Sequence, residues 1–436
     1  MKYTPDILAA HDDPKRLEEL YQAAQRDGEL GEFTADLLAC REQAPDNLLY
    51  AAWYYRLRPW PGEEPAVERA PVKWLLAVPL ALVTGLIFWG LTRDPLLNPR
   101  QEVPFQALIA GPILAAAIIA LLTLATRAHL RRGLVVVAAL AAACAYVVLL
   151  ARPLAHEQYG LLMVIHLPLL AWIGVGLVLL GLRSDHQDVF AVMSKSIEVL
   201  ITSGVFYLAG GLFAAITVGL FSALNVWIPH EIQDFVLTVG GGAVPVVAVA
   251  AVYDPHLRPA EQRFEEGLGK LLPTLTRLLL PLAVVVLAIY LVAIPFNFME
   301  PFRSRDVLVI YNVLLFAVMA LLIGAAPVRP DGLSGRQQSL LRLGILVVTG
   351  LTIVISLYAL SATVYRTVLG GPTMNRLTVI GWNVINTALL ALLAYRQLRR
   401  GRAAWLPALH SVVTLGAAAY IVWDLFLILL LPWLIR

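Results

Sequence analysis

The residues best placed to do chemistry are polar side chains that interrupt long apolar runs. Asp424 lies in AYIVWDLFLILLLPW, where a charge at mid-span costs about 2.5–3.5 kcal/mol. Such an acid is either a proton or cation site or a structural acid paired with an arginine. Arg376 lies near the start of the preceding apolar run, where the helix dipole disfavours a cation. We therefore expect Arg376 to pair with Asp424; if the two lie apart, Arg376 becomes a candidate for headgroup or ligand contact.

Other polar groups inside apolar runs favour structural roles. Arg277 in LLPTLTRLLLPL is expected to snorkel to the surface or pair locally, the alternative being contact with an anion or a lipid headgroup. Asn312, Asn383 and Asn386 are mid-span amides of the kind that join helices. Asn383 and Asn386 are three residues apart and share a helix face.

Histidines do not form a recognisable metal site. His166 and His410 are single imidazoles, which could relay a proton but are expected to bond between helices. Two His-Glu pairs, at 156–157 and 230–231, could offer a metal four ligands. They have no spacing signature, so we expect neither metal nor other cofactor. The chain also has no nucleotide-binding, metalloprotease, hydrolase or haem motif, and enzymatic function has no support.

A glycine triplet suggests a path for a solute. In TVGGGAVPVV, Gly241 lies at the centre of the triplet and Pro245 follows it. This composition can unwind a span, and unwound backbone in a membrane must line a cavity or be buried in protein. The alternative is a kinked, continuous helix whose glycines allow close packing.

These residues must be positioned by membrane-spanning helices. The chain has 436 residues, of which 59% are hydrophobic and 14% charged, whereas soluble domains carry about 25% charge. Runs of about 20 apolar residues match the thickness of the hydrocarbon core. We predict an all-α polytopic protein with eleven spans, at 73–91, 103–126, 133–151, 159–182, 197–224, 234–252, 271–295, 307–326, 342–365, 377–395 and 405–433.

The charges of the loops predict an orientation. Loops on the N-terminal side hold 19 Lys and Arg residues, against 8 on the opposite side. The positive-inside rule then places the N-terminus in the cytoplasm and the C-terminus outside. We expect a multi-pass protein of a bacterial inner membrane, with no cleavable signal peptide.

The first residues differ in character from the rest. Residues 1–70 carry a net charge of −6 and the remainder +9, which argues against nucleic acid as a partner of this segment. Residues 1–58 are predicted to be a soluble helical segment like one degenerate tetratricopeptide unit, with helices from residue 14 onward. Residues 59–72 would be a Pro/Glu-rich linker, and 73–436 the transmembrane bundle. A single unit cannot bury its own face, so we expect it to pack on the bundle or on a partner.

The stretch GGPTMNR, residues 370–376, resembles a motif of a bacterial integral membrane family with no assigned activity. The family motif is Tyr-Gly-Leu-Thr-x-x-Arg, followed at once by a span; Gly371, Thr373 and Arg376 match it, whereas Gly370 and Pro372 replace the Tyr and Leu. The resemblance covers about residues 190–396 and implies a membrane protein without adding a mechanism. Thr373 is also expected to cap the span that follows.

Three functions are compatible with these features. The first is transport or binding of a small or lipidic solute, suggested by Asp424 and the glycine triplet. The second is a scaffold or accessory subunit that docks a partner through residues 1–58. The third, with least support, is an enzyme acting on a lipid-linked substrate. The solute, the energy source and the oligomeric state have no signature in the sequence.

Overall fold

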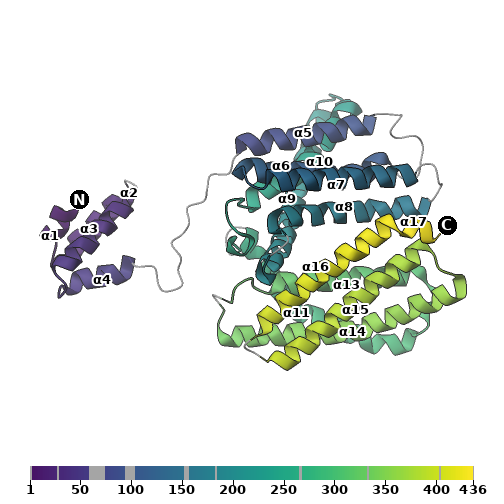
Figure 1. Ribbon diagram of the computed structural model, residues 1–436. Coiled ribbons are helices and arrows are strands. Elements are labelled where there is room, and N and C mark those ends of the chain that lie inside the picture. Colours follow the sequence, from purple (N-terminus) through teal and green to yellow (C-terminus); the bar gives the residue numbers. More distant parts are fainter. Residues whose placement is uncertain are drawn as a thin grey trace. The chain divides into compact units, whose positions relative to one another are not determined.

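The chain forms two compact units, Met1–Ala70 and Pro71–Arg436, in the computed structural model shown in Figure 1. The structure describes residues 2–26, 29–57, 74–93, 104–151, 157–181, 184–264, 268–330, 333–401 and 404–435. Every regular element in these ranges is helical. The predicted linker at 59–72 lies outside the described residues, and the two units are described separately.

The N-terminal unit has a hydrophobic core of its own. It consists of α1 (Thr4–Ala9), α2 (Pro14–Arg26), α3 (Leu30–Gln43) and α4 (Leu48–Leu57). The sequence analysis did not anticipate α1. Ile7 of α1 is fully buried with Phe33 and Trp53, and Asp36 accepts the backbone N–H of Tyr3 at 2.7 Å, which fastens the start of α1 to α3. Because α1 covers this face, the cluster that includes Ile7, Phe33 and Trp53 is buried within the unit itself.

The second unit, here called the membrane body, confirms the predicted all-α polytopic class. Eleven of its described helices are long and apolar enough to span a bilayer. They are α5 (Trp74–Arg93), α6 (Phe105–Thr126), α7 (Leu130–Ala151), α8 (Glu157–Leu180), α9 (His186–Ala223), α10 (His230–Val252), α11 (Leu268–Ala293), α13 (Arg305–Ala325), α14 (Gly335–Gly370), α15 (Met374–Arg400) and α16 (Trp405–Leu429). Short helices η1 (Pro259–Glu261), η2 (Ile294–Asn297), α12 (Glu300–Arg303) and α17 (Leu431–Leu434) lie at their ends.

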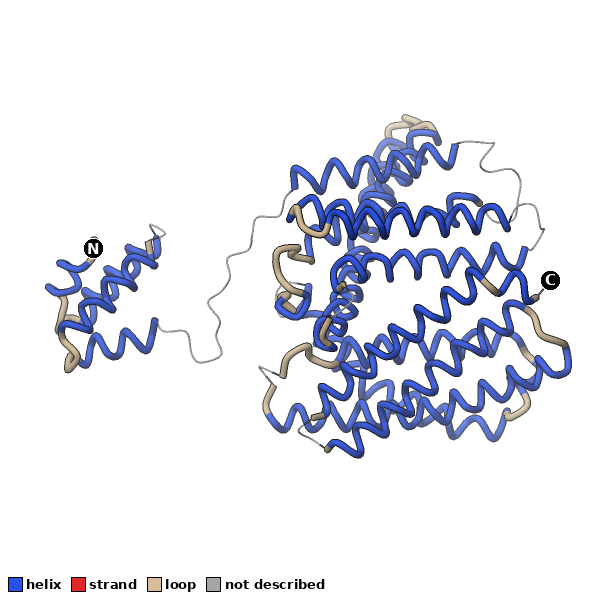
Figure 2. The backbone as a smooth tube through the Cα atoms, viewed as in Figure 1, coloured by secondary structure: helices blue, strands red, loops and turns tan. Residues whose placement is uncertain are grey.

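The spans form two groups of neighbours. Helices α5 to α8 pack with one another and with α10, whereas α11 and α13 to α16 pack among themselves. Contacts between the groups come from α8, which lies against α15 and α16, and from α9, which touches α10 on one side and α11, α13 and α16 on the other. Figures 1 and 2 show α8 beside α16 at this boundary, which we call the seam.

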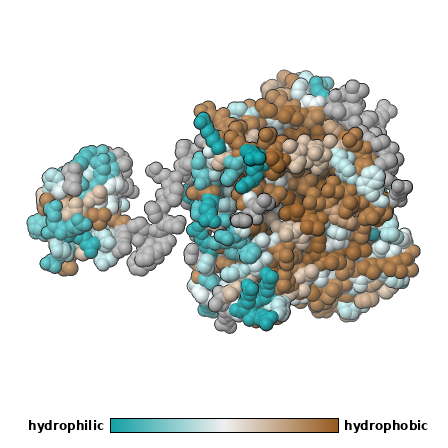
Figure 3. All heavy atoms as spheres, in the orientation of Figure 1, coloured by the Kyte–Doolittle hydropathy of each residue, from teal (hydrophilic) through white to brown (hydrophobic). Residues whose placement is uncertain are grey.

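The surface of the membrane body fits an apolar solvent. Figure 3 shows hydrophobic side chains over the middle of this face, with hydrophilic side chains gathered along the end at which α6 ends and α7 begins. Helices that are hydrophobic all round, such as α8 with its Leu, Val and Ile residues, belong in a core or a membrane. The arrangement follows from the low charge of the sequence.

The longest span, α9, changes its surroundings along its length. It has 38 residues, about 57 Å of helix. Residues from Asp188 to Ser203 are mostly buried, whereas most of 204–223 are exposed and none of them is buried. The predicted span began at 197, because the charged residues before it resemble a loop. The helix begins at His186 instead, since those charges find partners inside the protein.

Candidate functional site

Asp424 on α16 is buried without a partner. Its side chain is 3% exposed, and neither carboxylate oxygen has a hydrogen-bond partner among the described residues. No described cation lies within 4.0 Å of it. A buried charge is normally paired or hydrogen-bonded, so this acid is an exception that needs an explanation.

The expected pair between Arg376 and Asp424 is wrong. The Arg376 guanidinium donates through Nη1 to the carbonyl oxygen of Gly371 at 2.7 Å. The turn before α15 brings the carbonyl oxygen of Gly371, five residues before Arg376, within reach of the guanidinium. Thr373 does cap α15, since its hydroxyl accepts the Arg376 N–H at 3.3 Å. Arg376 is therefore held by its own turn.

Asp424 lines a cavity of about 320 Å³, here called the Asp424 cavity. Its walls come from α8, α9, α13, α15 and α16, so it lies on the seam. Most of the lining is Leu, Ile, Val, Met and Ala; the polar and indole side chains in the wall are Trp172, Trp382, Asn386, Tyr420, Trp423 and Asp424. A small polar set in an apolar wall is typical of ligand sites.

Asn386 leaves hydrogen-bonding capacity at the wall of this cavity. Its Oδ1 accepts the Tyr420 hydroxyl at 2.8 Å, but its Nδ2 is buried and has no partner among the described residues. The Asp424 cavity therefore has an unsatisfied donor on α15 and an unsatisfied acceptor on α16. A ligand with matching polar groups would satisfy both.

Asn383 joins helices, as expected of a mid-span amide. Its Nδ2 donates to Oδ1 of Asn312 at 2.9 Å, which links α15 to α13. It also donates to the carbonyl oxygen of Val379 at 2.9 Å. The sequence grouped Asn383 with Asn386, but only Asn386 reaches the cavity.

Arg277 has a local role at the end of a neighbouring helix. Its Nε donates to the carbonyl oxygen of Ala325, the last residue of α13, at 3.1 Å. A cation at a helix C-terminus is favourable because the last carbonyls lack intrahelical partners. This contact fits the expectation of local pairing.

The glycine triplet does not unwind its span. Helix α10 is continuous from His230 to Val252, with Pro245 inside it, so of the two alternatives weighed from the sequence the continuous helix is the one observed. A Cβ at Gly242 would overlap the Phe88 ring, which explains the close approach of α10 to α5. The carbonyl oxygen of Gly241 accepts the Tyr207 hydroxyl at 2.8 Å. Of the triplet, Gly242 thus serves helix packing, whereas a Cβ at Gly240 or Gly241 would meet open space.

The two histidines inside spans stack on aromatic rings. His166 lies 5.4 Å from the Trp382 ring, centroid to centroid, and His410 lies 4.2 Å from Phe190. Within the described residues, no three His, Cys, Asp or Glu side chains cluster as a metal site would require. Of the two His-Glu pairs, His156 and the Glu157 side chain lie outside what the structure describes.

A buried ion pair on α9 was not predicted from the sequence. Lys195 Nζ lies 2.8 Å from Glu198 Oε2, with the two side chains 4% and 8% exposed. Lys195 also donates to the carbonyl oxygen of Arg263. The signal in the sequence was the spacing of three in KSIE, which places opposite charges on one helix face.

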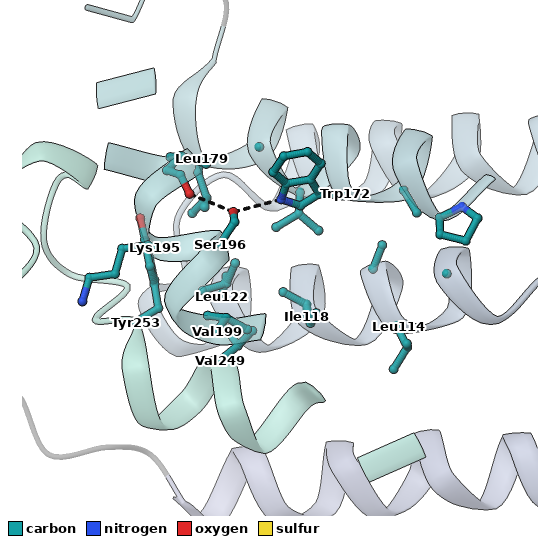
Figure 4. A pocket seen from close by; sticks show the side chains of 17 residues that line it. Leu114, Ile118, Leu122, Trp172, Leu179, Lys195, Ser196, Val199, Val249 and Tyr253 are labelled. Atoms are coloured by element: carbon teal, nitrogen blue, oxygen red, sulfur yellow. Dashed lines mark hydrogen bonds between the residues drawn. The ribbon is translucent and has the colours of Figure 1, made fainter. Parts of the chain in front are cut away.

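A second cavity lies next to the first. The α6–α9 groove, about 260 Å³, is lined mainly by apolar residues. In Figure 4, Trp172 and Ser196 meet at one part of it, bonded at 2.9 Å, while the Lys195 amine points away. Trp172 belongs to the walls of both the groove and the Asp424 cavity. This indole therefore separates the two spaces.

Comparisons of the chain with profiles of protein families, with curated proteins and with solved structures find no match. The resemblance of residues 370–376 to a membrane family motif is neither supported nor opposed by them. The site must accordingly be interpreted from its own geometry. That geometry belongs to a multi-pass helical protein of membrane type.

Proposed function

We propose that this protein binds a small apolar solute carrying a protonated amine in the Asp424 cavity and carries it across the membrane. One observation supports this most strongly: a buried carboxyl group with both oxygens unpartnered in a cavity of suitable size. Ligand pockets typically measure about 300–1,000 Å³, so the cavity accommodates a molecule of one or two rings.

The wall chemistry favours a cationic ligand over an anionic one. An ammonium group near Asp424 would relieve the cost of a buried charge. The indoles of Trp172, Trp382 and Trp423 can attract a cation through their faces. The amide Nδ2 of Asn386 is left to donate to an acceptor elsewhere on the solute.

A pair of matched probes tests the binding step. The full chain in lipid nanodiscs is titrated with 1-adamantylamine and, separately, with 1-adamantanol, and tryptophan fluorescence is recorded. The amine should bind at least about tenfold more tightly than the alcohol, since one charge-assisted contact is worth about 1.5–3 kcal/mol. Asp424→Asn should remove this preference, whereas Asp234→Asn, at an exposed acid on α10, should keep it. Equal binding of the two probes would contradict the proposal.

Transport needs its own measurement. Proteoliposomes containing the wild-type chain should take up radiolabelled 1-adamantylamine faster than liposomes with Asp424→Asn. If the two kinds of liposome took up the amine at equal rates while the wild-type chain still bound it, the protein would bind the solute without transporting it. The cytoplasmic placement of the N-terminus remains a prediction, which protease access to Met1–Ala70 in oriented vesicles can check.

A scaffold function has one observation in its favour. The N-terminal unit has its own core and yet exposes Leu48 and Tyr55, at 86% and 67%, as a docking module would. Deletion of residues 1–57 separates the two functions. Under the solute proposal, amine binding survives the deletion; under the scaffold alternative, the wild-type chain shows no amine preference and only partner binding is lost.

A further inference from the structure

A third cavity lies where α14 ends and α15 begins. It measures about 530 Å³ and draws its walls from α8, α13, α14 and α15. Its polar lining consists of Gln158, Asn312, Thr363, Arg366, Thr373, Asn375 and Arg376. We call it the arginine cavity. It has no acidic residue in its lining, in contrast to the Asp424 cavity.

Both arginines are positioned by backbone carbonyls, which do not neutralise them. Arg366 Nη1 donates to the carbonyl oxygen of Arg303 at 2.8 Å, and Arg376 Nη1 donates to that of Gly371 at 2.7 Å. Among the side chains that the structure describes, no carboxylate lies within 4.0 Å of either guanidinium. Each arginine has five N–H donors, so most of them remain available.

The helix that begins at this cavity adds to its positive character. The first amides of α15 point toward its N-terminal end, where the helix dipole favours an anion. Thr373 satisfies one of these amides by capping Arg376, and others remain. The two guanidinium groups and the positive end of α15 surround one space, and their like charges repel each other. An anion bound in that space would relieve the repulsion.

We propose that the arginine cavity binds a phosphate group, either of a lipid headgroup or of a soluble phosphate ester. The planar donors of arginine match phosphate oxygens in pairs. Leu161, Ile165 and Val309 also line the cavity and are about half exposed, which provides an apolar surface beside the cations. This site is independent of the solute proposed for the Asp424 cavity.

Thermal unfolding of the purified full chain in detergent tests the proposal. Three probes are added separately: phosphatidylglycerol, glycerol phosphate and phosphatidylcholine. A ligand that binds the folded state raises the melting temperature. We expect phosphatidylglycerol or glycerol phosphate to raise it more than phosphatidylcholine, because the choline cation of that lipid offsets the charge of its phosphate. Protection by the lipid alone assigns a headgroup, and equal protection by glycerol phosphate assigns a soluble ester.

Variants locate the effect. Arg366→Gln with Arg376→Gln should weaken the protecting probe by at least about tenfold, because two charge-assisted contacts are lost. Arg303→Gln removes an exposed charge at the same end of α14 without altering the cavity lining, and it should retain protection. If the double variant is protected as well as the wild type, the proposal is overturned.

Asn375→Asp keeps the test decisive even if the double arginine variant does not fold. It places a carboxylate in the cavity wall with almost no change in size. This internal anion should raise the melting temperature without ligand and weaken the protecting probe by at least about tenfold. An Asn375→Asp chain that gains no stability and binds the probe as before would also overturn the proposal. So would a wild-type chain that none of the phosphate probes protects.

Discussion

Two of the carboxyl groups buried in the membrane body, those of Glu198 and Asp424, have opposite surroundings. Glu198 on α9 lies 2.8 Å from the Lys195 ammonium, which in turn donates to a backbone carbonyl. Asp424 on α16 has no partner for either oxygen among the described residues. The first group is satisfied by the protein itself. The second leaves both oxygens available to the solute that we propose.

The contrast distinguishes a structural carboxyl group from a candidate functional one. A buried pair with its own hydrogen bonds holds helices in place, and removing one member is expensive. An unpaired acid in a cavity stabilises nothing, so its presence is better explained by a ligand. Burial alone therefore does not mark a functional residue; the absence of a partner, together with a space, does.

The largest effect is expected at the satisfied pair. Lys195→Leu or Glu198→Leu alone should lower the free energy of unfolding by about 3–5 kcal/mol, because the remaining charge stays buried and unpaired. The double replacement should recover most of that loss. Unfolding in mixed detergent micelles measures all three. If either single variant were as stable as the wild type, the pair would not be the structural element described.

The next largest effect is expected from a substitution that crowds the packing beside Asp424. A Cβ at Gly381 would overlap the Trp423 ring next to Asp424, so Gly381→Ala should cost about 1–3 kcal/mol. Gly350, with open space around it, is the matched control on α14. The same micelle assay reads both. If Gly381→Ala were as stable as the wild type, the side chains around Asp424 would have to shift at little cost to accommodate the added methyl group.

An intermediate case is the amide link between α13 and α15. Asn383→Leu should cost about 0.6 kcal/mol and no more than about 1.7, the range for such bonds within membranes. Combining it with Asn312→Leu should add less than the sum of the single effects, because the two side chains bond each other. Additive losses would show that the bond does not contribute.

The smallest stability effect is expected at Asp424. Asp424→Asn breaks no hydrogen bond of the protein, so the free energy of unfolding should change by less than about 1 kcal/mol. Dicyclohexylcarbodiimide, which attacks protonated carboxyl groups in apolar surroundings, should label Asp424 and leave Glu198 unmodified, as mass spectrometry of peptides would show. Labelling at both acids, or a large loss of stability in Asp424→Asn, would erase the distinction between them.

Hydropathy predicts the spans because a bilayer imposes a signal that is local in the chain. Eleven apolar runs became eleven helices. The start of α9 was missed because the charges of Asp188 and Lys195 resemble a loop until their partners are known. Helix α1 has six residues, too few for a periodic pattern.

Asp424 was identifiable from sequence because an acid inside an apolar run is rare. Its missing partner was not, since that depends on which helices meet. The pairing with Arg376 failed because a carbonyl of the same turn lies closer. The cavities also escaped prediction, because each is lined by at least four helices.

The seam between the two helix groups has a mechanical consequence. Both the Asp424 cavity and the arginine cavity are lined by α8 on one side of the seam and by α13 and α15 on the other, with α9 and α16 completing the first cavity and α14 the second. Rocking of one group against the other, a motion common in transporters, would therefore reshape the two spaces together. A disulfide between α8 and α15 would fix the shape of both cavities at once, so both can be controlled from the seam.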